Sequence, residues 1–131
     1  MTRIAFLDLG AMGARMAANL LDAGYPLTLW NRTAAAAQTL AALGADVADT
    51  PRAAAADADY VFAMVRDDAA ARAVWLDGDT GALHALRADA VAIDCSTLSV
   101  GGTADLAVAF DAADRAFLAA PVAGSRPQAE A

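Results

Sequence analysis

Short apolar runs alternate with helical segments along the 131-residue chain. The first run, residues 3–9, is almost continuously apolar, as expected for a strand that is covered on both faces. Strands alternating with helices are typical of βαβ units and a parallel sheet. The sequence therefore predicts a doubly wound α/β fold, with a mainly parallel sheet and helices on both faces. The remaining strands are predicted at 27–30, 45–47, 60–64, 91–94 and 116–120, and the helices at 11–23, 34–43, 51–56, 67–76 and 102–113.

Helix ends are marked by specific residue types. Gly24 and Gly44 follow the first two predicted helices, where glycine adopts the left-handed conformation that ends a helix. Thr50 and Pro51 are typical of an N-cap and the first helical position. These signals define three of the expected boundaries.

Composition excludes several functional classes. No stretch approaches the about 18–20 apolar residues of a membrane span, so no membrane partner is expected. The chain enters its first apolar run at once, which argues against a secretory signal, and its single cysteine is typical of a reducing cytoplasm. A net charge of −7 argues against nucleic-acid binding. All nine basic residues are arginines, so the chain contains no lysine.

A glycine-containing turn lies between the first predicted strand and the first predicted helix. Gly10 allows phosphates to approach the backbone, and Gly13 allows the helix to lie close to the sheet. Amides at such a helix start bind a pyrophosphate. We therefore expect a Rossmann-like dinucleotide site, the alternative being an ordinary turn between strand and helix. The expected cofactor-binding residues of this turn are Leu9, Gly10, Ala11, Met12 and Gly13.

Asp8 occupies the place of the first glycine in the dinucleotide fingerprint. Its Cβ strains a tight turn and its charge lies near the phosphates, which would weaken cofactor binding by ~1–3 kcal/mol. In the alternative, Asp8 turns aside and accepts local hydrogen bonds from the backbone. The sequence does not decide between the two.

The end of the second strand favours NADP over NAD. A carboxylate normally binds the ribose 2′-hydroxyl of NAD about 20 residues after the glycine turn. Here that place is held by Asn31, Arg32 and Thr33. The Arg32 guanidinium suits a 2′-phosphate, with Asn31 and Thr33 as hydrogen-bonding partners. The alternative for Arg32 is a solvated surface arginine.

Three ordered motifs resemble one family. They resemble the signatures of the β-hydroxyacid (3-hydroxyisobutyrate) dehydrogenases. The first motif comprises residues 10–20, Ala23-Gly24 and residues 30–33, the second residues 94–99 and the third residues 120–125. The sequence of residues 124–130 is most similar to that of the glyoxylate/succinic semialdehyde reductase branch. The resemblance implies hydride transfer between a nicotinamide and a small hydroxy acid or semialdehyde, with NADP(H) as cofactor.

The resemblance also assigns roles to later residues. It implies that residues 64–66 contact the cofactor and that Thr97 lies beside the nicotinamide ribose. It implies that a small, carboxylate-bearing substrate is held near Ser96 and by the segment 123–125. In the alternatives, Ser96 and Thr97 cap the next helix, and Gly124 and Ser125 form an ordinary loop. The full set expected from the resemblance is Met64, Val65, Arg66 and Thr97 for the cofactor, with Ser96, Ala123, Gly124 and Ser125 for the substrate.

Two further side chains can carry chemistry in principle. Cys95 is expected to be a small buried residue rather than a nucleophile, because no histidine is placed to activate it. His84 is the only histidine and lies in a polar connection, so a surface or packing role is expected. One histidine and one cysteine do not provide a metal site.

The catalytic group implied by the resemblance is missing. Members of the family use a lysine as proton donor or acceptor, and that lysine is expected beyond residue 131. The sequence thus suggests one NADP-binding domain over residues 1–131. This domain would be truncated before its last strands, without the helical domain that completes the substrate pocket and the family's dimer or tetramer. We expect this chain to be catalytically silent, and the alternative is a stand-alone, non-catalytic cofactor-binding or scaffold module.

Overall fold

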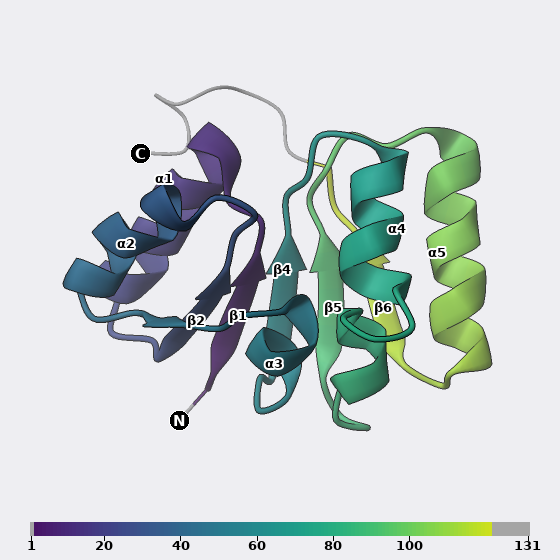
Figure 1. Cartoon of the computed structure of the whole chain (residues 1–131). Helices are drawn as coiled ribbons and strands as arrows, with labels where there is room; N and C mark the ends of the chain where they lie inside the picture. The colour runs from purple at the N-terminus through teal and green to yellow at the C-terminus, as the bar shows by residue number, and fades with distance from the viewer. Residues whose placement is uncertain (1, 122–131) are drawn as a thin grey trace.

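The computed structural model describes residues 2–121 of the chain. Within them, six strands form one sheet in the order β3-β2-β1-β4-β5-β6 (Figure 1). Every neighbouring pair is parallel, so the predicted α/β fold is confirmed and the sheet is parallel throughout. The strands are β1 (Ile4–Leu7), β2 (Leu27–Trp30), β3 (Asp46–Val47), β4 (Tyr60–Ala63), β5 (Val91–Asp94) and β6 (Ala116–Ala119).

Helices cover both faces of the sheet, as the sequence predicts (Figure 1). One face carries α1 and α2, and the other carries α3, α4, α5 and a 3₁₀ helix, η1. No helix among residues 2–121 is long and apolar enough to cross a membrane. The bounds are α1 (Gly10–Asp22), α2 (Ala34–Ala42), α3 (Pro51–Ala55), α4 (Asp68–Leu76), η1 (Ala82–Ala85) and α5 (Val100–Ala112).

Strand β1 is the centre of the sheet and contributes to both cores. Its first residue pairs with Leu27 of β2 on one side and with Tyr60 of β4 on the other. Ile4 and Phe6 pack into the core beneath α1 and α2. Ala5 and Leu7 pack into the opposite core. The continuous apolar run of this strand follows from its burial on both faces.

The larger core is built around a buried tryptophan of α4. The Trp75 ring meets the rings of Phe110 and Phe117 edge to face, with centroids 5.4 and 6.5 Å apart. Its indole N–H donates a hydrogen bond of 2.8 Å to Oδ2 of Asp94, which is only 2% exposed. A buried carboxylate requires such a donor, because its transfer out of water is otherwise costly.

The helix ends follow the predicted signals to within one or two residues, with one omission. Gly24 and Gly44 have φ of 93° and 112°, and the Thr50 side chain accepts from the Ala53 amide, so these three predictions are confirmed. Helix α5 begins at Val100 rather than at 102, because Ser99 caps it. The sequence analysis missed η1, whose four residues are too few to show a helical period.

Asp114 ends α5 in the left-handed conformation that glycine adopts after α1 and α2, with φ of 55°. Its amide donates to the Asp111 carbonyl, and the Arg115 amide donates to the Phe110 carbonyl, so all three helices share the same type of terminus. We expect Asp114→Gly to raise the free energy of unfolding by about 0.5–1 kcal/mol. The substitution relieves backbone strain in the folded state, and this gain exceeds the cost of the greater conformational freedom that glycine gives the unfolded chain. Urea titration measures this difference. Gly24→Asp is the matched reverse substitution and should destabilise; a loss of stability in Asp114→Gly would contradict the prediction.

Candidate functional site

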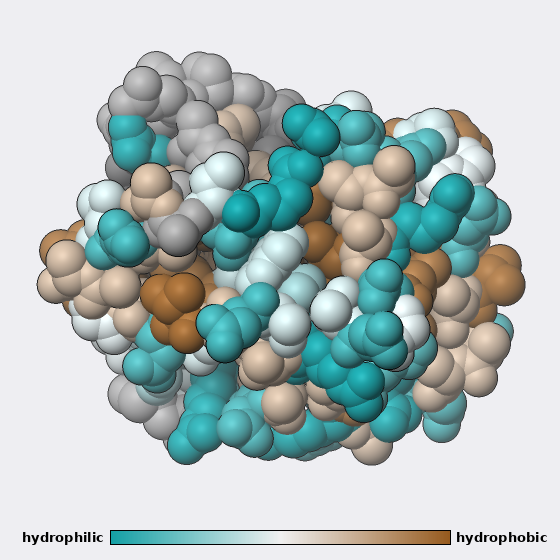
Figure 2. All heavy atoms as spheres, viewed as in Figure 1, coloured by the Kyte–Doolittle hydropathy of each residue, from teal (hydrophilic) through white to brown (hydrophobic). Residues whose placement is uncertain are grey.

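The predicted site residues that the structure describes follow the carboxyl ends of β1, β2, β4 and β5. These ends lie at one edge of the parallel sheet, at the top of Figure 1. In the same view, hydrophilic residues gather over this edge, between the two groups of helices (Figure 2). Ligands of open α/β sheets bind outside the carboxyl ends of the strands. The topology thus brings together segments that are far apart in the sequence.

The turn from β1 to α1 leads directly into the helix. Helix α1 begins at Gly10, and in the described structure Leu9 at its N-cap has no side-chain capping hydrogen bond. Residues 10–13 include no carboxylate. The amides of the first helical turn, which lack partners within a helix, carry the positive end of the helix dipole. This terminus suits an anion such as a pyrophosphate.

Gly13 has the packing role that its place in the motif predicts. A Cβ built on this residue would lie 3.3 Å from Cε1 of Phe6, a closer approach than most packed side chains make. It would also lie 3.6 Å from the Asp8 carbonyl oxygen and from Cβ of Met64. Glycine therefore lets α1 lie against β1 and the end of β4, as predicted.

Asn31 joins the two turns at the carboxyl ends of β1 and β2. Its Oδ1 accepts a hydrogen bond of 2.8 Å from the Leu9 amide. Its Nδ2 donates to the carbonyl and hydroxyl oxygens of Thr33, at 2.8 and 3.0 Å. The Leu9 side chain is itself fully buried. Leu9 and Asn31 hold the backbone of the predicted cofactor site in place.

Asp8 and Arg32 form an ion pair across the same two turns. Arg32 Nε donates to Asp8 Oδ2 at 2.8 Å, and the two side chains are 42% and 8% exposed. Asp8 has φ of 60°, a conformation that an L-residue rarely adopts. Arg32 is therefore an exposed surface arginine, as its alternative held, and it is also paired with Asp8. Asp8 turns aside, as its second alternative held, but toward a side chain 24 residues away.

Residues 64–66 continue from β4 at the same edge. The Val65 amide donates a buried hydrogen bond of 2.7 Å to Ser96 Oγ. Met64 is half-buried against the core beneath α1. The Arg66 side chain is 73% exposed, with Nε 3.6 Å from Oδ2 of Asp67. This segment leaves Arg66 accessible to a ligand.

Ser96 and Thr97 follow β5 and differ in exposure. Ser96 is buried: its hydroxyl accepts from Val65, and its amide donates to Asp94 Oδ1 at 2.8 Å. Thr97 is exposed. The alternative in which these two residues cap the next helix is wrong, because the Ser99 side chain caps α5 by accepting from the Gly102 amide.

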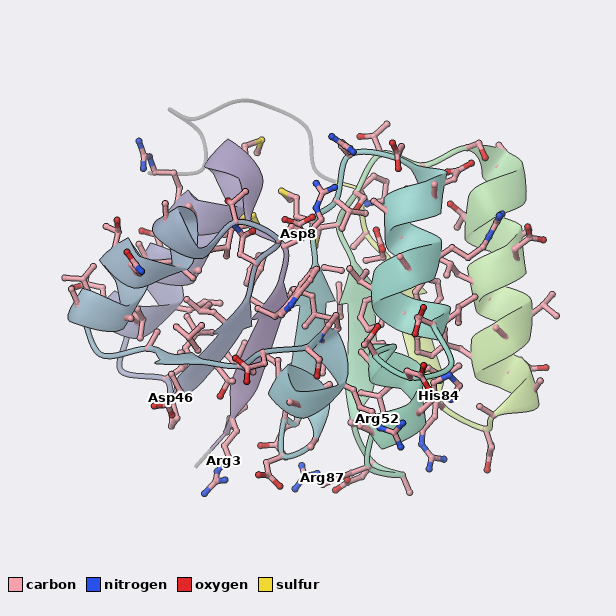
Figure 3. All side chains as sticks on the ribbon, viewed as in Figure 1. Arg3, Asp8, Asp46, Arg52, His84 and Arg87 are labelled. Carbon is pink, nitrogen blue, oxygen red and sulfur yellow. The ribbon has the colours of Figure 1, made fainter. Side chains whose placement is uncertain are left out.

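A hollow of about 180 Å³ lies beside Thr97 at the ends of β5 and β6. A larger hollow of about 470 Å³ lies at the opposite edge, where Arg3 and Asp46 are found, away from Asp8 (Figure 3). The smaller hollow belongs to the predicted site, because it lies at the carboxyl ends of the strands. Its lining comprises Asp94, Ser96, Thr97, Leu98, Thr103, Phe117, Ala119 and Pro121.

Sequence reasoning missed Asp68, which fixes the segment after Thr97. The amide of Ser99 donates to Asp68 Oδ1 at 2.9 Å, and its hydroxyl donates to Oδ2. These two hydrogen bonds lower the pKa of Asp68 below its usual value. A Cβ on Gly102 would lie 2.5 Å from the Asp68 carboxylate. The contact joins residues that are 31 apart in sequence, so no local sequence pattern predicts it.

Cys95 and His84 lie where the sequence analysis expected them. Cys95 is buried, as predicted, and its burial next to Asp94 raises the pKa of the thiol to about 11. The thiol is therefore protonated at neutral pH. Because the thiolate is the nucleophilic form of cysteine, Cys95 is a poor nucleophile. His84 is exposed on η1 and lies far from Asp8 (Figure 3). Ala123, Gly124 and Ser125 lie outside the described residues.

Residues 3–131 match the family model described as the NAD binding domain of 6-phosphogluconate dehydrogenase. The chain belongs to this family. It is 44% identical over 129 residues to an uncharacterized oxidoreductase, YfjR, of Bacillus subtilis, covering 98% of this chain and 44% of that protein. The chain thus spans less than half the length of this relative.

Solved structures agree with this membership. The 3-hydroxyisobutyrate dehydrogenase of Mycobacterium tuberculosis, solved with L-serine, matches with a TM-score of 0.91 and 35% identity, over 99% of this chain and 43% of that one. Psf3, in complex with NADP+ and 2-OPP, matches with a TM-score of 0.90 and 26% identity, over 97% of this chain and 45% of that one. The chain is thus a member of the NAD binding domain family, and it is similar in sequence and structure to part of a 3-hydroxyisobutyrate dehydrogenase.

Proposed function

We propose that residues 1–131 form the NADP-binding domain of an oxidoreductase that transfers hydride between a nicotinamide and a small hydroxy acid or semialdehyde. The observation that carries this proposal is the placement of Arg32, at the end of β2, beside the glycine turn that opens α1. A cation there suits the 2′-phosphate that distinguishes NADP from NAD. The same edge of the sheet provides an open helix N-terminus for the pyrophosphate.

The residues present fit such a cofactor. The amides of residues 10–13 would bind the pyrophosphate, and Gly13 keeps α1 close to the sheet. Arg32 and Thr33 would bind the 2′-phosphate, while Asn31 and Leu9 hold the two turns together. Met64, Val65 and Arg66 would line the path toward the nicotinamide. When bound, the nicotinamide supplies or accepts the hydride.

The substrate would lie at the ends of β5 and β6. Thr97 is exposed beside the 180 Å³ hollow and would contact the nicotinamide ribose or the substrate. Ser96, whose oxygen is already engaged, would position Thr97 rather than bind substrate itself. We retain Ala123, Gly124 and Ser125 as proposed contacts of a substrate carboxylate. Assignment to the glyoxylate/succinic semialdehyde reductase branch stays a prediction.

The proton donor of the reaction is proposed to lie outside these residues. The chain contains no lysine, and the resemblance implies a lysine in that role. General acid–base catalysis contributes about 10²–10⁴-fold to such reactions. We therefore expect the 131 residues to bind cofactor without turnover.

The experiment that tests the proposal is a calorimetric titration of NADPH, and separately of NADH, into this chain. We expect NADPH to bind more tightly than NADH. Arg32→Gln should weaken NADPH binding by about tenfold, the equivalent of one hydrogen bond between charged groups, and NADH binding by less than about threefold. Absence of binding by both cofactors would overturn the cofactor role, and tighter binding of NADH would overturn the role of Arg32.

Arg72→Gln is the matched control. Arg72 also pairs with an aspartate, Asp105, at 3.4 Å, but on the outer surface of α4 and α5. Its replacement removes an arginine and an ion pair without touching the candidate site. Both cofactors should bind this variant as they bind the unmodified chain. An equal loss in both arginine variants would mean that net charge alone determines binding.

A further inference from the structure

Asp8 has a strained backbone conformation, and two of its hydrogen bonds join it to the end of β2. Its amide donates to the Trp30 carbonyl at 2.7 Å, and its carboxylate accepts from Arg32 at 2.8 Å. Its φ of 60° favours glycine, and an L-residue there costs of order 1 kcal/mol. The carboxylate is nearly buried, with the side chain 8% exposed. The ion pair with Arg32 offsets that burial.

The pair changes what Arg32 can offer to an anion. A guanidinium binds a phosphate best through two parallel N–H groups, and Asp8 engages the Nε–H of Arg32, which leaves the Nη donors for a phosphate. The carboxylate also cancels the charge of the arginine. A 2′-phosphate at this point would therefore meet one cation and one competing anion.

We propose that Asp8 is a cofactor-selectivity residue, whose carboxylate competes with the 2′-phosphate of NADP for Arg32. The inference rests on the proposed function, because it assumes that Arg32 faces the 2′-phosphate. Because Asp8 holds the Nε–H and offsets the charge of Arg32, the Nη donors of the paired arginine bind the phosphate more weakly than those of an unpaired one, and the apparent affinity for NADP is reduced. NADH carries no 2′-phosphate, and its affinity depends far less on the pair. Asp8 thereby narrows the preference for NADP that Arg32 creates.

The decisive variant is Asp8→Asn, which removes the charge and keeps the size of the side chain. Asparagine tolerates the left-handed conformation, so the turn is retained. We expect calorimetric titration to show a gain of at least about tenfold in affinity for NADPH and of less than about threefold for NADH. In an Arg32→Gln background the same substitution should raise NADPH affinity by less than about threefold.

Asp8→Gly and Asp114→Gly separate charge from backbone strain. Asp8→Gly removes both the charge and the strain, so it should also favour NADPH, and it keeps the test valid if the asparagine variant fails to fold. Asp114 is the other non-glycine residue of the described chain with positive φ, and it lies before β6 at the opposite edge of the sheet. Its replacement relieves similar strain and should leave both affinities unchanged. Thermal melts establish that each variant is folded.

The outcomes distinguish the inference from the proposed function. If Asp8→Asn leaves the ratio of NADPH to NADH affinity unchanged, the selectivity role of Asp8 is wrong. If its gain in NADPH affinity persists without Arg32, Asp8 repels the phosphate directly and the competition for Arg32 is wrong. The cofactor site stands in both cases. If neither cofactor binds any variant, Asp8→Gly included, the proposed function is wrong and the inference is wrong with it.

Discussion

Trp75→Phe is expected to lower the free energy of unfolding by about 2–4 kcal/mol. The indole is fully buried, so the smaller ring leaves a cavity between α4 and α5. The larger part of the effect comes from Asp94, whose Oδ2 loses its 2.8 Å donor while remaining buried. Urea denaturation followed by circular dichroism measures the change.

A double-mutant cycle with Asp94→Asn isolates the hydrogen bond. Asparagine removes the buried charge, so the loss of the indole donor then matters less. We expect a coupling free energy of about 1–2 kcal/mol between the two substitutions. Trp30→Phe is the control, because Trp30 is only half-buried, and it should cost about 1 kcal/mol or less. Additivity of the Trp75 and Asp94 effects to within about 0.5 kcal/mol would contradict this account.

Gly81→Ala is expected to destabilise the chain by about 3 kcal/mol. A Cβ on Gly81 would lie 2.5 Å from the Asp77 carbonyl oxygen and 2.8 Å from that of Trp75. These are backbone atoms of the last turn of α4 and of the turn that follows it, so relief requires this backbone to move. The Gly81 amide donates to that same Asp77 carbonyl, and this hydrogen bond would lengthen. Chemical denaturation again provides the measurement.

Gly78→Ala in the same turn is the matched control. A Cβ on Gly78 would meet no atom within 4 Å, and its φ is not positive. The alanine variant should be as stable as the unmodified chain, or more stable by up to about 1 kcal/mol, because its unfolded state has less conformational freedom. Equal stability of the Gly78 and Gly81 variants would show that the close contact is relieved at no cost.

The sequence predicted the parallel α/β arrangement because its signals are local. Every strand except the two-residue β3 is a short, mostly apolar run, and Gly24 and Gly44 end α1 and α2 in the left-handed conformation. The boundary of α5 was two residues late because Ser99, and not a later residue, is its cap. Burial of Cys95 and the packing role of Gly13 also followed from residue type and position.

The contacts within the candidate site were not predictable in the same way. Arg32 reaches Asp8 across 24 residues, and Val65 reaches Ser96 across 31, because β1 pairs with β2 and β4 with β5. Residue types suggested that Arg32 was available to a phosphate. The partner that engages it is defined only when the register of the two strands is known.

The central position of β1 has a consequence for synthesis on the ribosome. Its two pairing edges are filled by residues 27–30 and 60–63, so the second edge stays open until β4 has been made. At about 5–20 residues per second, roughly 3–10 s separate β1 from β4. During that interval a strand that is apolar on both faces has an unpaired edge, which favours aggregation or capture by a chaperone. Substitutions in β4 that delay this pairing should therefore affect the yield of folded protein more than its final stability.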